Sequence, residues 1–278
     1  MKHGDDDHIE ITRWIEQARA AFGRPEPEEG GWGAYDEAIS ALNFRGDRAT
    51  FDAARALLDA EEPHDRIIAT QVLGQLGVPE RTFPGLCFEA LAGQVKREQD
   101  PEVLGALGGN LAHLDLPGVV DVALPLVGHA DARVRFGAVL ALSRQEDPRA
   151  IDALVRLSAD SDPEVRNWAT FGLGVQTDAD TPALRAALKA RLDDPELDGE
   201  IRGEALVGLA ERGESGITVY VARALDQLDP LAVRAAALIG DPALHGPLVA
   251  LRDHPEMTPH FGETLDEAIA RCDPDAEV

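Results

Sequence analysis

The central part of the chain repeats one pattern at a fixed spacing, and this repeat constrains the fold more than any other feature. A segment that begins Pro117-Gly-Val-Val-Asp-Val-Ala-Leu returns 31 residues later as Pro148-Arg-Ala-Ile-Asp-Ala-Leu-Val. The segment Asp131-Ala-Arg-Val-Arg-Phe-Gly-Ala returns in the same way as Asp162-Pro-Glu-Val-Arg-Asn-Trp-Ala. A period between about 20 and 50 residues is typical of proteins built from stacked repeats. The sequence therefore predicts a repeat array that forms one elongated domain.

Each repeat has the pattern of two short helices. Pro148 suits the first position of the first helix, because the N–H that proline lacks would be unpaired there anyway. Asp162 is a favoured N-cap for the second helix, and Pro163 follows it at the first helical position. Apolar or small residues, beginning with Val165 and Ala169, then recur at the spacing of one helix face. This pattern predicts an all-α fold.

The second helix of the repeat resembles that of a HEAT repeat. The motif is Asp-Pro-x-Val-Arg-x-x-Ala followed by Gly-Leu-Gly, and it runs from Asp162 to Gly174. It is similar to the short bacterial HEAT-like repeats that also occur in phycobilisome lyases. The resemblance extends over about residues 46–272. It implies a right-handed α-solenoid of about seven helical hairpins.

The ends of the array do not fit the repeat. Residues 1–8 are expected to be disordered, and residues 9–45 to form an N-terminal helical cap with a Gly/Pro/Glu-rich linker at 23–33. Thr12 is a candidate N-cap for the first helix of this cap. Arrays need such caps to cover their first exposed face. The repeat array is expected over 46–272, with a tail at 273–278.

An arginine recurs with the repeat, often four residues after a carboxylate, as in Asp131 with Arg135 and Asp162 with Arg166. We interpret these residues as a structural ladder that caps helices and ties neighbouring repeats together. A catalytic role is the alternative interpretation. The arginines of the ladder are Arg66, Arg135, Arg166, Arg202 and Arg234.

The charge of the chain limits the kinds of partner that it can be expected to bind. Asp and Glu number 51 against 26 Lys and Arg, and the formal net charge is −25. Nucleic acids and anionic membrane surfaces are bound mainly by cationic groups, so neither is expected as a partner. The charge favours a basic protein partner, or serves solubility alone. Arginine is common and lysine scarce, which is typical of a GC-rich bacterial genome.

The cysteines and the apolar runs predict a reduced, cytoplasmic protein that is expected to be monomeric. Cys87 and Cys272 lie in opposite halves of the array, too far apart for a disulfide in a solenoid. No apolar run approaches the roughly 20 residues needed to span a bilayer. The acidic start of the chain does not have the pattern of a signal peptide.

No catalytic residue, cofactor or metal site is predicted. The histidines do not form an HExxH pair, and no phosphate-binding loop or GxSxG motif is present. His254 and His260 flank a loop that contains Glu256, but such a set is more often simply exposed than bound to metal. The glycine-rich segment from Gly105 to Gly109 lies inside a predicted helix, where tight packing or room for a ligand explains it better than a nucleotide site.

One ridge of the second helices is mostly apolar, whereas a helix face exposed to solvent is expected to be polar. It runs along the second helices, on the side opposite the core positions, and stacked hairpins place these helices on a concave surface. Two interpretations remain open: the ridge is an exposed binding groove, or the helices are rotated and it is buried against the next repeat. The candidate partner-binding residues are Ile67, Phe136, Leu140, Asn167, Trp168, Phe171, Val207 and Ile239.

These features favour a non-enzymatic scaffold or adaptor that binds a protein or peptide, which is either basic or carries an apolar anchor. Such a protein could also neutralise a basic toxin. The resemblance to phycobilisome-lyase repeats implies the alternative of a bilin-lyase-like or chaperone-like protein that acts on a client. Recognition of damaged DNA, which some HEAT-like glycosylases perform, is disfavoured by the negative charge.

Overall fold

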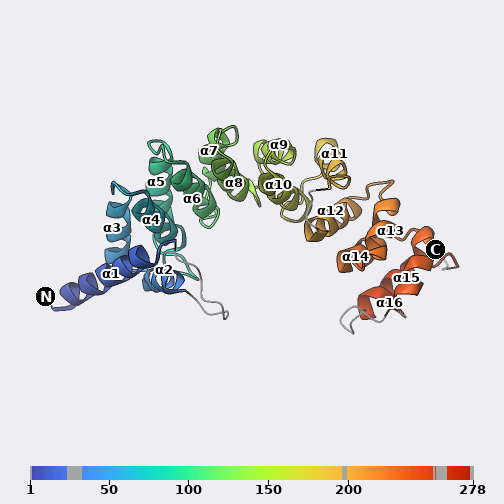
Figure 1. Cartoon of the computed structure of the whole chain (residues 1–278), viewed down its shortest axis with the longest axis horizontal. Coiled ribbons are helices and arrows are strands. Elements are labelled where there is room, and N and C mark those ends of the chain that lie inside the picture. The colour runs from blue at the N-terminus through green and yellow to red at the C-terminus, as the bar shows by residue number, and fades with distance from the viewer. Residues whose placement is uncertain (1, 24–32, 196–198, 253, 255–261, 276–278) are drawn as a thin grey trace. The chain divides into compact units, whose positions relative to one another are not determined.

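The computed structural model describes residues 2–23, 33–195, 199–252, 254 and 262–275. Within these ranges the chain is all-helical, with sixteen α-helices, two short 3-10 helices and no strand. The chain divides into two compact units, Met1–Leu142 and Ser143–Val278 (Figure 1). Each unit is a stack of helical pairs, the arrangement of an α-solenoid. The predicted all-α fold is confirmed.

The first unit begins with two helices that precede the repeats, α1 (Lys2–Ala21) and α2 (Ala34–Arg45). Three helical pairs follow, and their second helices, α4, α6 and α8, pack side by side in that order. The bounds of these pairs are α3 Arg48–Leu57, α4 Pro63–Gln75, α5 Pro84–Val95, α6 Pro101–Leu111, α7 Val119–Ala123, η1 Leu124–Leu126 and α8 Ala132–Leu142.

The second unit contains four helical pairs. Their second helices, α10, α12, α14 and α16, again pack side by side in chain order. The bounds are α9 Pro148–Leu157, α10 Pro163–Val175, α11 Pro182–Arg191, α12 Gly199–Glu211, α13 Thr218–Asp226, α14 Pro230–Ile239, η2 Pro242–Leu244, α15 His245–Arg252 and α16 Gly262–Arg271.

Aspartate caps start many of these helices. The Asp162 carboxylate accepts hydrogen bonds from the backbone N–H groups of Glu164 and Val165, at 3.0 and 3.1 Å. These two donors would otherwise lack a partner in the first turn of α10. The predicted helix start at Asp162 is therefore confirmed. The same cap precedes three other helices that begin with proline, at Asp100, Asp147 and Asp229.

Glycine lets α6 and α8 touch backbone to backbone. A Cβ added at Gly108 would lie 2.5 Å from the carbonyl carbon of Gly137. A Cβ added at Gly137 would lie 2.4 Å from the carbonyl oxygen of Gly105. Real Cβ atoms do not approach backbone this closely, so alanine at these positions would force the two helices apart. Of the two roles considered for this glycine-rich segment, tight packing is the one observed.

The N-terminal region differs from expectation. Helix α1 begins at Lys2, so residues 2–8 are helical and not disordered. Thr12 lies inside this helix and does not cap it; its hydroxyl donates to the carbonyl oxygen of His8 at 2.9 Å. The expected linker falls mostly on residues 24–32, which lie outside the described residues.

The third helical pair also departs from the pattern. Its first helix, α7, begins at Val119 and not at Pro117, after Gly118 with a φ of 100°. It gives way to η1 at Leu124. The cause is Pro125, which has no N–H to donate to a preceding carbonyl and interrupts the α-helical hydrogen bonds.

The recurring arginines hold the loops between helices. Arg66, Arg135 and Arg166 each donate through one terminal nitrogen to two carbonyl oxygens of the loop before their own helix, at 2.8 to 3.1 Å. Arg202 similarly binds the carbonyl oxygen of Asp194 at 3.0 Å. Arg234 pairs with Glu211 at 2.7 Å. These contacts join each second helix to the loop or helix beside it.

Asp131 and Asp162 do not pair with the arginines that follow them by four residues. Asp162 caps α10, and Asp131 instead pairs with Arg133 at 2.7 Å. The reason is that an N-cap carboxylate turns toward the first-turn N–H groups, whereas the arginine side chain extends toward the loop carbonyls. Arg166 reaches forward to Asp194, at 3.4 Å.

The two cysteines are buried free thiols. Cys87 lies in α5, and Cys272 follows α16, where its thiol donates to the carbonyl oxygen of Ala236 at 3.4 Å. Burial raises the pKa of the Cys87 thiol to about 11, so it stays protonated and unreactive at neutral pH. Among the described helices, none is both long enough and apolar enough to cross a lipid bilayer.

Candidate functional site

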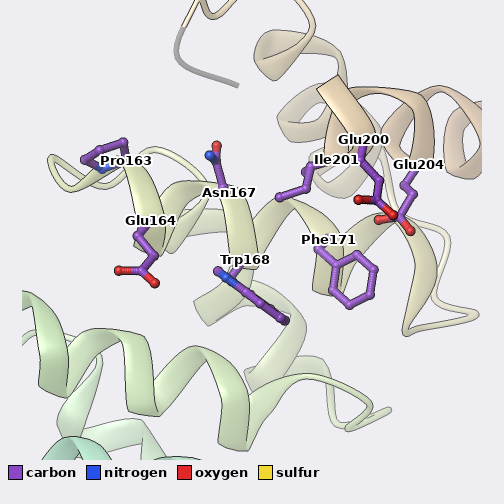
Figure 2. A pocket seen from close by; sticks show the side chains of 8 residues that line it. All are labelled: Pro163, Glu164, Asn167, Trp168, Phe171, Glu200, Ile201 and Glu204. Carbon is purple, nitrogen blue, oxygen red and sulfur yellow. The ribbon is translucent and has the colours of Figure 1, made fainter. Parts of the chain in front are cut away.

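A groove of about 640 Å³ lies along α10 and α12 in the second unit (Figure 2). It runs beside the N-terminal parts of the two helices. Its lining combines aromatic, aliphatic and carboxylate side chains. The described lining residues are Pro163, Glu164, Asn167, Trp168 and Phe171 from α10, and Glu200, Ile201 and Glu204 from α12.

Close contact near the C-terminal ends of α10 and α12 sets the spacing of the groove walls. A Cβ added at Gly208 would lie 2.4 Å from the carbonyl oxygen of Gly174. Arg212 directly follows α12, and its guanidinium donates to five carbonyl oxygens. Three of these lie at the end of α10 or just after it. A planar group with five donors suits this task. The two helices are thereby fixed to each other at one end.

A residue of α11 orients the side chain of Asn167. Its side-chain oxygen accepts a hydrogen bond from the guanidinium of Arg191 at 3.2 Å. Arg191 is 6% exposed and also donates to the hydroxyl of Thr170 at 3.3 Å and to the carboxylate of Asp194. This polar network holds the wall of the groove where α11 packs against α10.

Two aromatic side chains form the apolar wall. Trp168 and Phe171 project from the same side of α10 (Figure 2). Their ring centroids are 5.6 Å apart and their planes meet at 79°, an edge-to-face contact. Trp168 is 39% exposed, and Phe171 is half-buried. The contact fixes both rings while leaving aromatic surface open to a ligand.

Two carboxylates on α12 form the wall opposite the aromatic rings. Glu200 and Glu204 stand one turn apart on α12, and Glu164 lines the groove from α10. Burial raises the pKa of the Glu204 carboxyl, and the negative charge of Glu200 raises it further. Of the eight described lining residues, three are carboxylates and none is basic. The groove therefore has a negative electrostatic potential beside an apolar surface.

The structure brings together only part of the predicted ridge. Asn167, Trp168 and Phe171 line the groove. Phe136 and Leu140 lie on α8 of the first unit, and Ile239 ends α14; these three are partly exposed and are not among the lining residues.

Ile67 and Val207 do not belong to an exposed surface, contrary to the ridge interpretation. They are 7% and 6% exposed. Both lie on helices with stacked neighbours on two sides, α4 between α2 and α6, and α12 between α10 and α14. At these two positions, the alternative interpretation of burial between repeats is the one observed.

The sequence analysis missed the α12 side of the groove. The ladder arginines Arg166 and Arg202 occupy equivalent positions, so Glu200 and Glu204 are the repeat counterparts of Glu164 and Trp168. The missing signal was this pair of glutamates spaced by four residues, on the flank of the helix and not on its ridge. A search of equivalent positions on both flanks would have found them.

No group of three or more His, Cys, Asp or Glu side chains in the described part of the chain is arranged to hold a metal ion. Of the histidine pair considered for a metal site, His254 is described, whereas His260 and Glu256 lie outside the described residues. The groove itself offers carboxylates and aromatic rings, which suit the binding of a cation.

The motif resemblance is matched independently by a family model. Residues 88–174 match the model for HEAT repeats. This stretch consists of HEAT repeats. It covers α6, α7, η1, α8, α9 and most of α5 and α10, so the aromatic wall of the groove lies within it. No curated protein sequence matches the chain.

Two solved structures are similar in fold along most of the chain. The crystal structure of YibA from E. coli is 18% identical, with a TM-score of 0.71, and the match covers 93% of this chain and 94% of YibA. An engineered protein is 17% identical with a TM-score of 0.55, over 95% of this chain and 78% of that one. At these identities the likeness concerns the fold alone.

A third structure, human deoxyhypusine hydroxylase in complex with glycerol, is 16% identical over 96% of this chain and 98% of that one, with a TM-score of 0.36.

Proposed function

We propose that this chain is a non-enzymatic binding scaffold, and that its second unit holds a basic segment of another protein in the groove between α10 and α12. The observation that carries the proposal is the meeting of carboxylates and exposed aromatic surface in one groove. A cationic side chain is attracted to carboxylates by charge and to the face of an aromatic ring by its quadrupole. Its aliphatic stem can cover apolar surface at the same time.

The charge of the whole chain supports the same kind of partner. A formal net charge of −25 attracts a basic protein over a distance and raises the rate of encounter. Stacked helical repeats also present extended surfaces of the kind used for binding proteins and peptides. An adaptor and a neutraliser of a basic protein would both use this chemistry.

The test is direct binding of defined peptides to the full chain. A short labelled peptide of lysine, arginine and leucine is compared with a matched peptide in which glutamate replaces the basic residues. Fluorescence anisotropy is measured at low and at high salt. We expect the basic peptide to bind, with an affinity that falls as salt rises, and the acidic peptide not to bind.

Variants separate the groove from the general charge of the surface. Trp168→Ala and Glu204→Gln should each weaken binding of the basic peptide by about tenfold or more. Val175→Ala, at an exposed position on α10 outside the groove lining, and Asp226→Asn, on α13, are the matched controls and should bind as the wild type does. Equal losses in groove and control variants would contradict the proposal, since binding would then reflect charge alone.

A further inference from the structure

We infer that the residue which anchors the partner in this groove is an arginine rather than a lysine. The inference rests on the proposed function and specifies the chemistry of its ligand. The guanidinium would lie against Trp168 and donate to Glu200 and Glu204.

The spacing of the two glutamates favours a forked donor. Glu200 and Glu204 lie four residues apart on one helix, which places their Cβ atoms about 5 to 6 Å apart on the same face. A guanidinium has five N–H donors in a fixed plane and can serve two carboxylates at once. An ammonium has three donors around one compact charge and lacks the pairs of parallel N–H groups with which a guanidinium binds carboxylates in two-point contacts.

The aromatic wall favours a planar cation for a second reason. Trp168 offers exposed indole surface, and its edge-to-face contact with Phe171 fixes the orientation of the ring. A guanidinium stacks flat on such a ring. It is also less strongly hydrated than an ammonium, so entering the groove costs it less hydration free energy. Figure 2 shows these rings on α10, with Glu200 and Glu204 on the neighbouring helix.

A simpler contact of the same kind occurs within the chain itself. The guanidinium carbon of Arg48 lies 5.2 Å from the centroid of the Phe51 ring, and its Nε lies 3.0 Å from the carboxylate of Asp52. One arginine is thus held by an aromatic ring and a carboxylate on the same helix.

The electrostatics of the groove fit the same ligand. The raised pKa of Glu204 reflects partial burial and the nearby charge of Glu200, so two carboxylates repel each other there. A bound guanidinium would remove this repulsion.

The experiment compares peptides that differ at one residue. A short leucine- and alanine-containing peptide carries a single central arginine, lysine or citrulline, the last being a neutral isostere of arginine. Binding to the full chain is measured by isothermal titration calorimetry for the wild type, Trp168→Ala, Glu204→Gln and the control Val175→Ala. We expect the arginine peptide to bind about five- to tenfold more tightly than the lysine peptide, and the citrulline peptide to bind most weakly.

The variants decide what such a difference means. Trp168→Ala and Glu204→Gln should weaken binding of the arginine peptide most and bring its affinity close to that of the lysine peptide. Val175→Ala should preserve the difference in affinity between the two peptides. Equal binding of arginine and lysine peptides that still depends on Trp168 and Glu204 would overturn the arginine inference and leave the proposed function standing. If no peptide binds, or if groove variants have no effect, both the inference and the proposed function are wrong.

Discussion

Arg66 and Glu98 form a forked ion pair between two helical pairs of the first unit. The guanidinium of Arg66 donates to both carboxylate oxygens of Glu98, at 2.8 and 3.0 Å. The side chains are 13% and 5% exposed. Glu98 also accepts hydrogen bonds from the side chain of Gln94 and from the backbone N–H groups of Gln99 and Asp100. The pair therefore joins the start of α4 to the loop between α5 and α6.

Removing one member of this pair should destabilise the first unit strongly. Arg66→Ala leaves the Glu98 carboxylate buried without its counter-charge, which typically costs about 3 to 5 kcal/mol. Urea denaturation followed by circular dichroism measures the change. Asp52→Ala is the control, because its ion pair with Arg48 is exposed, at 52% and 60%, and its loss should leave the free energy of unfolding nearly unchanged. Similar losses of stability in both variants would contradict the proposed contribution of the buried ion pair to the free energy of unfolding.

The same pair predicts how stability depends on pH. Burial alone would raise the pKa of Glu98, but the hydrogen bonds from Arg66, Asp100, Gln94 and Gln99 outweigh it and hold the pKa at about 2, below the ordinary value of 4.5. A lowered pKa stabilises the fold above the unfolded pKa, and this contribution is lost as the pH falls from about 4.5 to about 2. Its size is on the order of 3 kcal/mol at most.

Glu98→Gln isolates this contribution from the other carboxylates. The variant should be less stable than the wild type at pH 7, and the difference between the two should shrink as the pH falls toward about 3. Denaturation curves of both proteins across this range measure it. A difference that is independent of pH would show that Glu98 contributes through packing and not through its charge.

The contact between α6 and α8 predicts opposite effects for two glycine substitutions. Gly137→Ala places a Cβ against the backbone of Gly105 and should destabilise the first unit by about 1 to 3 kcal/mol. Gly93→Ala in α5 is the matched control, since an added Cβ meets nothing within 4 Å there. It should stabilise the chain by about 0.5 to 1 kcal/mol, because alanine favours a helix more than glycine does. Thermal unfolding measures both variants. A lower melting temperature for both Gly137→Ala and Gly93→Ala would contradict this account.

Two neighbouring substitutions on α10 test whether the aromatic wall is a surface for binding or part of the core. Leu173 is 0% exposed, and Leu173→Ala should cost about 3 to 5 kcal/mol of stability. Phe171→Ala should cost only about 1 to 2 kcal/mol, mainly the loss of its contact with Trp168. Thermal melts compare the two. A loss at Phe171 as large as that at Leu173 would place this side chain in the core and remove it from the binding surface.

The aromatic wall of the groove could be predicted from sequence, whereas its acidic wall was not. Asn167, Trp168 and Phe171 stood out because they follow a single well-marked repeat. Glu200 and Glu204 belong to the next repeat, whose second helix has Gly199 where its neighbour has Pro163. Which side chains of two helices face each other depends on the rotation of both helices, and periodicity in one helix does not determine it.

The sequence by itself determined the all-helical repeat and most of the helix starts, because these depend on interactions within a few residues. Asp162 and Pro163, for example, start α10 through hydrogen bonds to its own first turn. The tertiary structure alone decided which apolar positions are exposed and which charges meet. Ile67 and Val207 are buried while Trp168 is open, and Arg66 pairs with Glu98 from the next helical pair rather than with a carboxylate four residues before it. The physical reason is that burial and ion pairing are set by how neighbouring helices pack, at distances along the chain that local pattern does not reach.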